Sequence, residues 1–335
     1  MSGQGHAGIR GGLFHEPHAR RNPMTVRDAL RQGISRLREA NVPSHALAAE
    51  LLLMHALGRD RAWIYSRPES PVGSADVERY FGLLARRSAG EPTQYLTGKR
   101  EFWGLEFEVN PSVLIPRPET EHVVEVAIQR VRARRRNEGF ATGERAGKIR
   151  IADVGTGSGC IAVALAKELP FAEILATDIS PAALEVASRN AVRHGVADRI
   201  RFIETDLLES VFREPRVTAH ESRLFDLIVS NPPYVARDEA ASLAREVGEH
   251  EPEIALFGGQ AGTEIYGRLI EQAGVLLAGT GILVLELGYD SAPHVRSILE
   301  SDVGWTGLEV ANDLAGIPRV VSARRAPTST ETPSL

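Results

Sequence analysis

The stretch "IRIADVGTGSGCIAVALA", residues 149 to 166, decides the fold because three glycines join a strand-like segment to a helix-like one. Glycine permits a tight turn and lets a ligand lie directly against the backbone. The start of the helix that follows presents unpaired N–H groups. We therefore expect this turn to bind a polar group.

The spacing of these glycines excludes two common nucleotide-binding patterns. The dinucleotide pattern G-x-G-x-x-G needs glycine at position 160, where this chain has Cys160. A phosphate-binding loop needs Gly-Lys followed by Ser or Thr, and no such run follows the turn. The pattern that remains is G-x-G-x-G, preceded by Asp153.

Strand-like and helix-like segments alternate along the chain from this turn onward. The strand-like segments are "IRIADV", "EILATD", "IRFIET", "FDLIVS" and "GILVLEL", and helix-like segments begin near residues 158, 181, 263 and 291. This alternation predicts a parallel sheet covered by helices on both faces. The final segment, "TGLEVANDLAGIPRVVSAR", is typical of two strands around a turn, which would add an antiparallel edge. We predict an α/β fold with a mixed sheet.

The first part of the chain has a different organisation. Residues 25 to 89 show helical spacing of apolar side chains, and residues 91 to 121 alternate aromatic and β-branched residues around Gly104, which suggests a hairpin. The two ends of the chain are polar, and we expect both to be disordered. The predicted division is an extension at 1–23, a small helical domain at 24–98, a β-hairpin linker at 99–118, an α/β domain at 119–324 and a tail at 325–335.

The composition is that of an ordinary water-soluble protein. Of its 335 residues, 43% are hydrophobic and 25% are charged, and no apolar run approaches the roughly 18 residues that a membrane span needs. The net charge of −5 argues against a protein whose main task is to hold a nucleic-acid backbone. Cys160 is the only cysteine, which excludes an intramolecular disulfide and favours a cytoplasmic location. We predict no metal site.

Two acids stand at the ends of later strands. Asp178 ends the second strand, where a carboxylate can accept hydrogen bonds from both hydroxyls of a ribose, and Asp206 ends the third. Either acid alone can cap a helix, and the Ser180-Pro181 pair after Asp178 invites that interpretation. Because the glycine turn and both acids gather at the sheet edge where open α/β sheets bind ligands, we favour a ligand site.

This block resembles the nucleotide-binding half of class I S-adenosylmethionine-dependent methyltransferases. In that family the glycine turn holds the methionine part of the cofactor, the second-strand acid holds the ribose, and the residues after the third strand flank the adenine. The family often has an aromatic residue at the position of Leu207, so this chain departs from the pattern there. The resemblance assigns S-adenosyl-L-methionine to Gly155, Thr156, Gly157, Ser158, Gly159, Asp178, Asp206, Leu207 and Asn231.

The segment "SNPPYVA", residues 230 to 236, follows the fourth strand and is expected beside the cofactor. Pro232 and Pro233 fix φ and cannot donate ladder hydrogen bonds, so they end the strand. The Asn231 side-chain oxygen and the Pro232 carbonyl can accept both N–H bonds of a planar amide or base amine, with Tyr234 packed over it. The motif resembles enzymes that methylate such nitrogens. We predict catalytic roles for Asn231, Pro232 and Tyr234.

Segments outside this motif discriminate between glutamine and nucleic-acid bases as the substrate. Residues 91–121, the helical domain before them and "HEPEIALFGGQAG" at 250–262 resemble the release-factor glutamine methyltransferases. That family methylates N5 of the glutamine in the Gly-Gly-Gln loop of peptide chain release factors, and engages its partner through the helical domain. The resemblance implies a release-factor partner, without membrane or strong nucleic-acid binding. A ribosomal-protein glutamine methyltransferase, a DNA or RNA amino-methyltransferase and a non-catalytic release-factor-binding module are the alternatives.

The run "PRPET", residues 116 to 120, permits two interpretations. The resemblance implies that Arg117 and Glu119 line the mouth of the active site. The run is also a favourable junction between linker and helix, because proline suits the first helical position and acids suit the first turn. Both interpretations stay open. The predicted substrate-binding set is Asn231, Pro232, Pro233, Tyr234, Arg117 and Glu119.

Overall fold

The computed structural model describes residues 23–137, 147–212 and 225–326. The predicted extension at 1–23 lies outside the described residues except for Pro23, and so does most of the predicted tail. The chain divides into two compact units, Met1–Leu84 and Ala85–Leu335. The bounds of the five predicted segments stay predictions.

The first unit consists of helices. They are α1 (Val26–Glu39), α2 (His45–Leu57), α3 (Arg61–Ser66) and α4 (Ser74–Ser88), whose last turn continues into the second unit. Thr25 caps α1, since its hydroxyl accepts a hydrogen bond from the backbone N–H of Asp28 at 3.1 Å. The helices pack on a buried Tyr80, whose hydroxyl donates to the carbonyl of Ala49 at 3.2 Å.

A short helix and a two-stranded hairpin begin the second unit. These are α5 (Thr93–Thr97), β1 (Lys99–Phe102) and β2 (Leu105–Glu108), with β1 and β2 antiparallel. The hairpin turns at Trp103 and Gly104, whose φ angles are 55° and 66°. A two-residue turn of this kind needs positive φ at both positions, which suits the right-handed twist of the strands.

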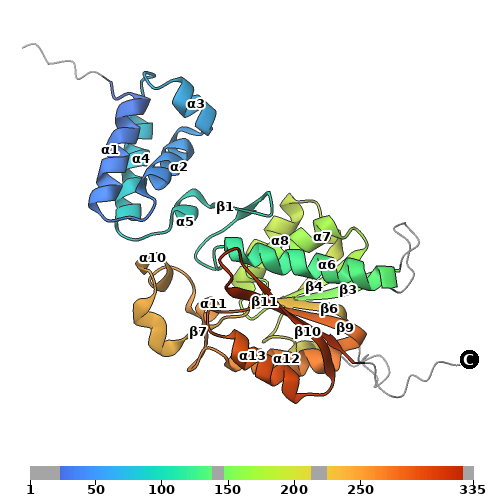
Figure 1. The fold of residues 1–335 in the computed structure, drawn as a ribbon. Helices are drawn as coiled ribbons and strands as arrows, with labels where there is room; N and C mark the ends of the chain where they lie inside the picture. The colour runs from blue at the N-terminus through green and yellow to red at the C-terminus, as the bar shows by residue number, and fades with distance from the viewer. Residues whose placement is uncertain (1–22, 138–146, 213–224, 327–335) are drawn as a thin grey trace, which may run out of the picture. The chain divides into compact units, whose positions relative to one another are not determined.

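A seven-stranded mixed sheet forms the centre of the second unit (Figure 1). Its strands are β3 (Ile149–Val154), β4 (Ala172–Asp178), β5 (Ile200–Glu204), β6 (Phe225–Ser230), β9 (Leu277–Glu286), β10 (Trp305–Asn312) and β11 (Pro318–Arg325). They lie in the order β10-β11-β9-β6-β3-β4-β5, and β11 alone runs opposite to the other six, so it pairs antiparallel with both β10 and β9. The predicted mixed α/β sheet with an antiparallel edge is confirmed.

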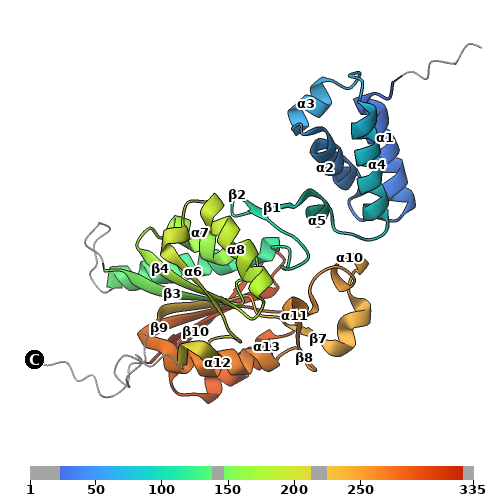
Figure 2. The same ribbon diagram turned by 180° about the vertical axis from the view of Figure 1, so that it is seen from behind.

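Helices cover both faces of this sheet, as Figure 2 shows from behind. One face packs on α6 (Glu121–Asn137), α7 (Cys160–Glu168) and α8 (Pro181–Arg193), and the other on α12 (Glu264–Leu276) and α13 (Ala292–Ser301). Alternate strand residues supply the two cores: Ile151 faces the first set of helices and Ala152 the second. Side chains that alternate in this way explain why the central strands are apolar throughout.

The remaining elements lie mainly in the connections at the sheet edges. They are η1 (Pro118–Thr120), η2 (Ala197–Arg199), α9 (Glu209–Phe212), β7 (Val235–Ala236), η3 (Arg237–Ser242), α10 (Arg245–Gly248), α11 (Glu253–Leu256) and β8 (Phe257–Gly259). Short β7 and β8 pair in parallel outside the main sheet. Within the three described ranges, no helix is both long enough and apolar enough to cross a membrane.

Two glycines of the helical unit provide a matched test of its packing. A Cβ at Gly33 would lie 1.8 Å from the Tyr80 hydroxyl, whereas a Cβ at Gly82 in α4 would meet nothing within 4 Å. We expect Gly33→Ala to destabilise the unit by about 1–3 kcal/mol through overpacking. Gly82→Ala should stabilise it by about 0.5–1 kcal/mol through helix propensity. Denaturant unfolding measures both, and equal effects would contradict the packing described.

Candidate active site

A cavity of about 500 Å³ lies at the carboxyl ends of the central strands. Residues that directly follow β3 and β6, such as Gly155 and Asn231, line it together with Asp178 at the end of β4. The chain order reverses between β3 and β6, because β4 and β5 extend the sheet on one side and β6 on the other. A reversal of this kind opens a crevice that open α/β sheets use for ligands.

The glycine turn is tied to the end of β4 by hydrogen bonds. Asp178 accepts the backbone N–H of Gly157 on Oδ2 and that of Ser180 on Oδ1, both at 2.9 Å. Each carboxylate oxygen therefore has one further lone-pair direction for a ligand. Burial raises the pKa of Asp178, although these backbone donors oppose that shift. The acid that was predicted to hold a ribose thus also supports the turn.

Asp153 is fully buried beneath the same turn. Its Oδ2 accepts the Thr156 hydroxyl at 2.6 Å and the backbone N–H of Ala162 at 3.1 Å, and its Oδ1 has no partner among the described residues. Burial raises the pKa of Asp153 to about 7. The hydroxyl of Ser158, a lining residue, is likewise buried without a partner in the described part of the chain. Unpaired buried groups of this kind suit a polar ligand.

The third strand end adds a strained backbone position. Leu207 lines the cavity with φ at 50°, in the left-handed region that only glycine adopts easily. The Thr177 hydroxyl holds it by donating to the Leu207 carbonyl at 2.9 Å. Asp206 pairs with Arg268 at 2.6 Å. Neighbouring elements therefore hold both residues of the predicted adenine-binding pair in place.

Asn231 extends from the end of β6 toward the start of α6. Its side-chain Nδ2 donates to the hydroxyl of Thr120 at 3.1 Å, and Thr120 is the last residue of η1. Since Asn231 has only one other polar side-chain atom, its amide oxygen is the atom left for a ligand. The Thr120 side chain is 2% exposed, so this contact is shielded from solvent.

A glycine-rich loop packs against the backbone of the motif that follows Asn231. A Cβ at Gly258 would lie 2.4 Å from the Pro233 carbonyl, and one at Gly262 would lie 2.5 Å from the Tyr234 carbonyl. No residue with a side chain fits at either place without displacing the motif. This approach accounts for the "FGGQAG" part of the segment at 250–262.

Tyr234 packs against the end of β9 and is not among the residues that line the cavity. A Cβ at Gly288 would lie 2.8 Å from the Tyr234 ring, and the Tyr234 hydroxyl is 3.5 Å from Oε1 of Glu286. Glu286 ends β9 and is 2% exposed. Burial raises its pKa to about 7, while hydrogen bonding by Thr120 opposes that shift.

Arg117 lies at the cavity and is held by a buried acid. Its guanidinium donates to Glu251 at 2.6 Å, and the same carboxylate accepts the backbone N–H of Ile115 at 3.1 Å. Burial raises the pKa of Glu251, against the opposing effect of Arg117. This contact joins the "PRPET" run to the segment at 250–262.

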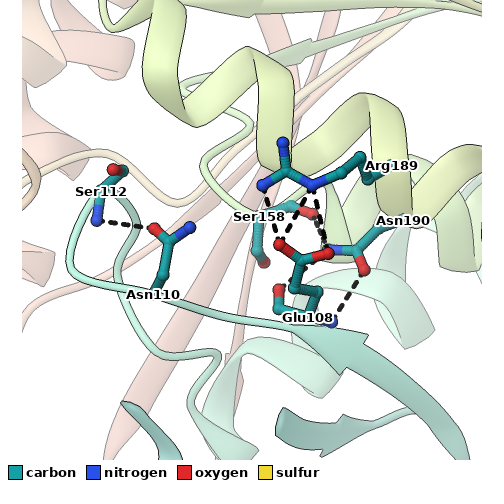
Figure 3. Close-up of polar contacts among 6 residues, drawn as sticks. All are labelled: Glu108, Asn110, Ser112, Ser158, Arg189 and Asn190. Atoms are coloured by element: carbon teal, nitrogen blue, oxygen red, sulfur yellow. Dashed lines mark hydrogen bonds and ion pairs between the residues drawn. The ribbon is translucent and has the colours of Figure 1, made fainter. Parts of the chain in front are cut away.

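Asn190 clamps the hairpin onto the glycine turn (Figure 3). Its side-chain oxygen accepts the Glu108 N–H at 2.8 Å, and its Nδ2 donates to the carbonyls of Glu108 at 3.0 Å and Ser158 at 2.9 Å. Asn190 is fully buried. The linker that leads to the cavity-lining residue Ser112 is thereby fixed relative to the glycine turn.

The structure brings most of the predicted site residues into one cavity. Those that line it are Arg117, Gly155, Thr156, Gly157, Ser158, Asp178, Asp206, Leu207, Asn231 and Pro233. Within the described ranges, Gly159, Glu119, Pro232 and Tyr234 are not among the lining residues. The functional roles of both sets stay predictions. The described residues hold no group of three or more His, Cys, Asp or Glu side chains placed to bind a metal ion.

Sequence reasoning missed four residues that position this site: Thr120, Asn190, Glu251 and Glu286. Thr120 and Glu251 lie in segments that carry the family resemblance, but neither segment indicates which residue it contacts. The one available signal for Glu286 was an acid within the apolar run "GILVLEL". A charged residue at the end of a buried strand is uncommon unless it is paired or functional.

Comparison with known proteins connects this chain to one family. Models of the PrmC N-terminal domain and of the methyltransferase small domain match residues 28–98 and 142–253. The release factor glutamine methyltransferase of Koribacter versatilis is 43% identical over 306 residues, which are 91% of this chain and 100% of the relative. That of Nitratidesulfovibrio vulgaris is 41% identical over 302 residues, 90% of this chain and 95% of the relative.

A solved structure with a related description is also similar. It is the protein-(glutamine-N5) methyltransferase (release factor-specific) of Alicyclobacillus acidocaldarius, with 29% sequence identity and a TM-score of 0.38. The match covers 66% of this chain and 100% of that chain.

The Asn190 clamp can be tested against its neighbour Arg189. Asn190→Ala removes partners from part-buried backbone groups of Glu108 and from the buried carbonyl of Ser158, so we expect a loss of about 2–4 kcal/mol in unfolding free energy. Arg189→Gln breaks only an ion pair with Glu108 at 2.7 Å, whose arginine is 48% exposed, and should cost less than about 1 kcal/mol. Denaturant unfolding compares the two, and an equal loss would argue against the clamp.

Proposed function

The chain belongs to the release factor glutamine methyltransferases, and from that membership we propose the reaction that its cavity performs. The enzyme transfers a methyl group from S-adenosyl-L-methionine to N5 of the glutamine in the Gly-Gly-Gln motif of a peptide chain release factor. The observation that carries this proposal is the position of the Asn231 amide, directly after β6 in the lining of the cavity and beside the start of the glycine turn.

The cavity suits the proposed cofactor in its donors and acceptors. The turn from Gly155 to Gly159 would hold the methionine part, and Asp178 the ribose, since each of its oxygens has a free lone pair. Apolar Ile179 and Leu207 line the same cavity, and we assign the adenine to them in place of an aromatic residue. When bound, S-adenosylmethionine supplies an electrophilic methyl group on a sulfonium.

Asn231 and Pro232 act on the substrate amide. A carboxamide nitrogen is a poor nucleophile because its lone pair is delocalised into the carbonyl. The Asn231 side-chain oxygen, with its own nitrogen engaged by Thr120, accepts one substrate N–H, and the Pro232 carbonyl accepts the other. Two fixed acceptors orient the amide plane and stabilise positive charge as it develops on the nitrogen. Proline keeps its carbonyl direction rigid.

Arg117 and Glu251 define the entrance to this cavity. The arginine side chain lines the cavity while its partner carboxylate is buried, so the guanidinium has little rotational freedom. A rigid cation with unused N–H donors suits the backbone carbonyls of an extended peptide loop. We assign Arg117 to substrate binding on this basis. We place Glu119 near Glu286, because the negative charge of Glu119 raises the pKa of Glu286.

The substrate can be established by direct competition. Purified protein and radiolabelled S-adenosylmethionine are offered a release factor, ribosomal proteins and DNA in parallel. Label should appear in the release factor, at the glutamine of its Gly-Gly-Gln motif. Label in ribosomal protein or DNA alone would replace the proposed substrate with one of the alternatives, and label in none of them would favour a non-catalytic binding module.

Asn231→Ala separates chemistry from cofactor binding. We expect methyl transfer to fall by at least about 100-fold, because one of two fixed acceptors is lost. Cofactor affinity, measured by calorimetric titration, should be retained. Turnover near the wild-type rate would refute the two-acceptor mechanism.

Asp178→Ala should act on binding instead. Loss of a carboxylate that accepts both ribose hydroxyls is expected to weaken cofactor affinity by about 10- to 100-fold. Asp178→Asn is the matched control, because it keeps the shape and one acceptor oxygen, and should have an intermediate affinity. Calorimetric titration measures both, and unchanged affinity in the alanine variant would remove Asp178 from the cofactor site.

A further inference from the structure

We propose that Arg87 is a positioning residue for the substrate peptide, because it anchors α10 and, through Glu251, holds Arg117 at the cavity entrance. Arg87 lies in the last turn of α4, within the second unit, and is 159 positions from its partner Glu246. This inference rests on the proposed function and extends it to a residue outside the cavity lining.

Residues 237–256, the segment between β7 and β8, form one wall of the cavity. Arg237 and residues 252–255 line the cavity from this segment. Of the whole segment, which the structure describes without a gap, only Glu251 and Leu256 are buried, so apolar packing holds little of it in place. A segment with few buried contacts opens easily unless other contacts restrain it. Between its two ends, polar contacts therefore set the position of this wall.

Arg87 supplies the first of these contacts. Its Nη2 donates to Oε2 of Glu246 in α10, and its Nη1 donates to the Glu91 carbonyl at 3.2 Å. The Arg87 side chain is 5% exposed, so its guanidinium has little freedom to move. At Gly90, where φ is 108°, a Cβ would lie 3.2 Å from Nε of Arg245, so the turn after α4 packs directly on α10. Two consecutive residues of α10 are therefore held by this turn.

The residue after Glu246 carries the anchor toward the cavity. The carbonyl of this residue, Val247, accepts the Glu251 N–H at 3.0 Å. The Glu251 carboxylate accepts in turn from the Arg117 guanidinium at 2.6 Å. Each step from Arg87 to the arginine assigned to the substrate is therefore a hydrogen bond or the single peptide link inside α10.

A buried arginine is by itself weak evidence for a role in stability. Taking its charge out of water is costly, and apolar residues of similar volume often stabilise such a position equally well. The Nε atom of Arg87 is also buried without a hydrogen-bond partner in the part of the chain that the structure describes. An ion pair suits a different task, which is to specify one position of a segment that apolar packing leaves loose. The Arg87 pair therefore orients α10 more than it strengthens the fold.

Two variants of the full-length protein and two matched controls test the anchor. Arg87→Met and Glu246→Gln each break the pair, and the KM for the release factor should rise about 10-fold with kcat within about twofold of wild type, because Arg117 binds the peptide before and during methyl transfer. Arg86→Met and Glu249→Gln break only exposed ion pairs at the same two helices, so KM should stay within about twofold.

A double variant shows whether Arg87 acts through Arg117. Arg117→Met removes the guanidinium itself, and the KM for the release factor should rise about 10-fold or more. Arg87→Met added to it should change KM by less than about threefold, because the contact that Arg87 positions is already lost. Cofactor affinity by calorimetric titration should stay within about twofold of wild type in all of these variants, because the glycine turn is untouched.

Hydrogen exchange tests the anchor without any substrate. The backbone N–H groups of Glu251 and Ile115 both donate hydrogen bonds along this path. Glu246→Gln should speed their exchange by about 10-fold or more, since the segment opens more often. The Gly157 N–H in the glycine turn should exchange at the wild-type rate, and Glu249→Gln should change none of the three.

The outcomes are distinguishable from failure of the proposed function. An unchanged KM or unchanged exchange in Glu246→Gln would overturn the anchor, even if Arg87→Met did not fold. So would KM effects of Arg87→Met and Arg117→Met that multiply in the double variant. If the wild-type protein methylated ribosomal protein or DNA instead, the proposed substrate would be wrong, and the same KM ratios on that substrate would decide the anchor. If it methylated none, the exchange rates would still decide whether α10 holds Glu251.

Discussion

The parallel pairing of β3 with β6 is the constraint on which the site depends. In this register Val154 lies opposite Ser230, and the Ser230 hydroxyl donates to the Val154 carbonyl at 2.7 Å. The next residue on each strand is Gly155 and Asn231, so the turn assigned to the cofactor and the amide assigned to the substrate begin side by side. A register shift of one residue would turn Asn231 toward the opposite face of the sheet.

Close backbone packing keeps the residues after Asn231 in position. The loop that contains Gly258 and Gly262 lies directly on the Pro233 and Tyr234 carbonyls, and β7 pairs with β8 beside it. Arg117 and its buried partner Glu251 join this loop to the linker. One side of the cavity is therefore assembled from the linker and the loop between β6 and β9, while the other side comes from consecutive strand ends.

The different origins of the two sides of the cavity explain which parts of the site could be predicted from the sequence. The glycine turn and Asp178 follow successive strands, and parallel strands bring such positions to one edge by geometry alone. The position of Asn231 followed from the same rule. The contacts of Thr120 with Asn231 and of Asn190 with Glu108 join residues 111 and 82 positions apart, and no local pattern specifies such pairs.

The sequence by itself determined the alternation of strands and helices, the mixed sheet, the family and the strand-end residues that gather at one edge of the sheet, because periodicity and turn chemistry are local properties. Only the tertiary structure decided which way the Asn231 amide is held, that Tyr234 packs against the end of β9, and that Glu286 is buried beside it. Those features depend on hydrogen-bond partners and desolvation, which exist only once distant segments are packed together.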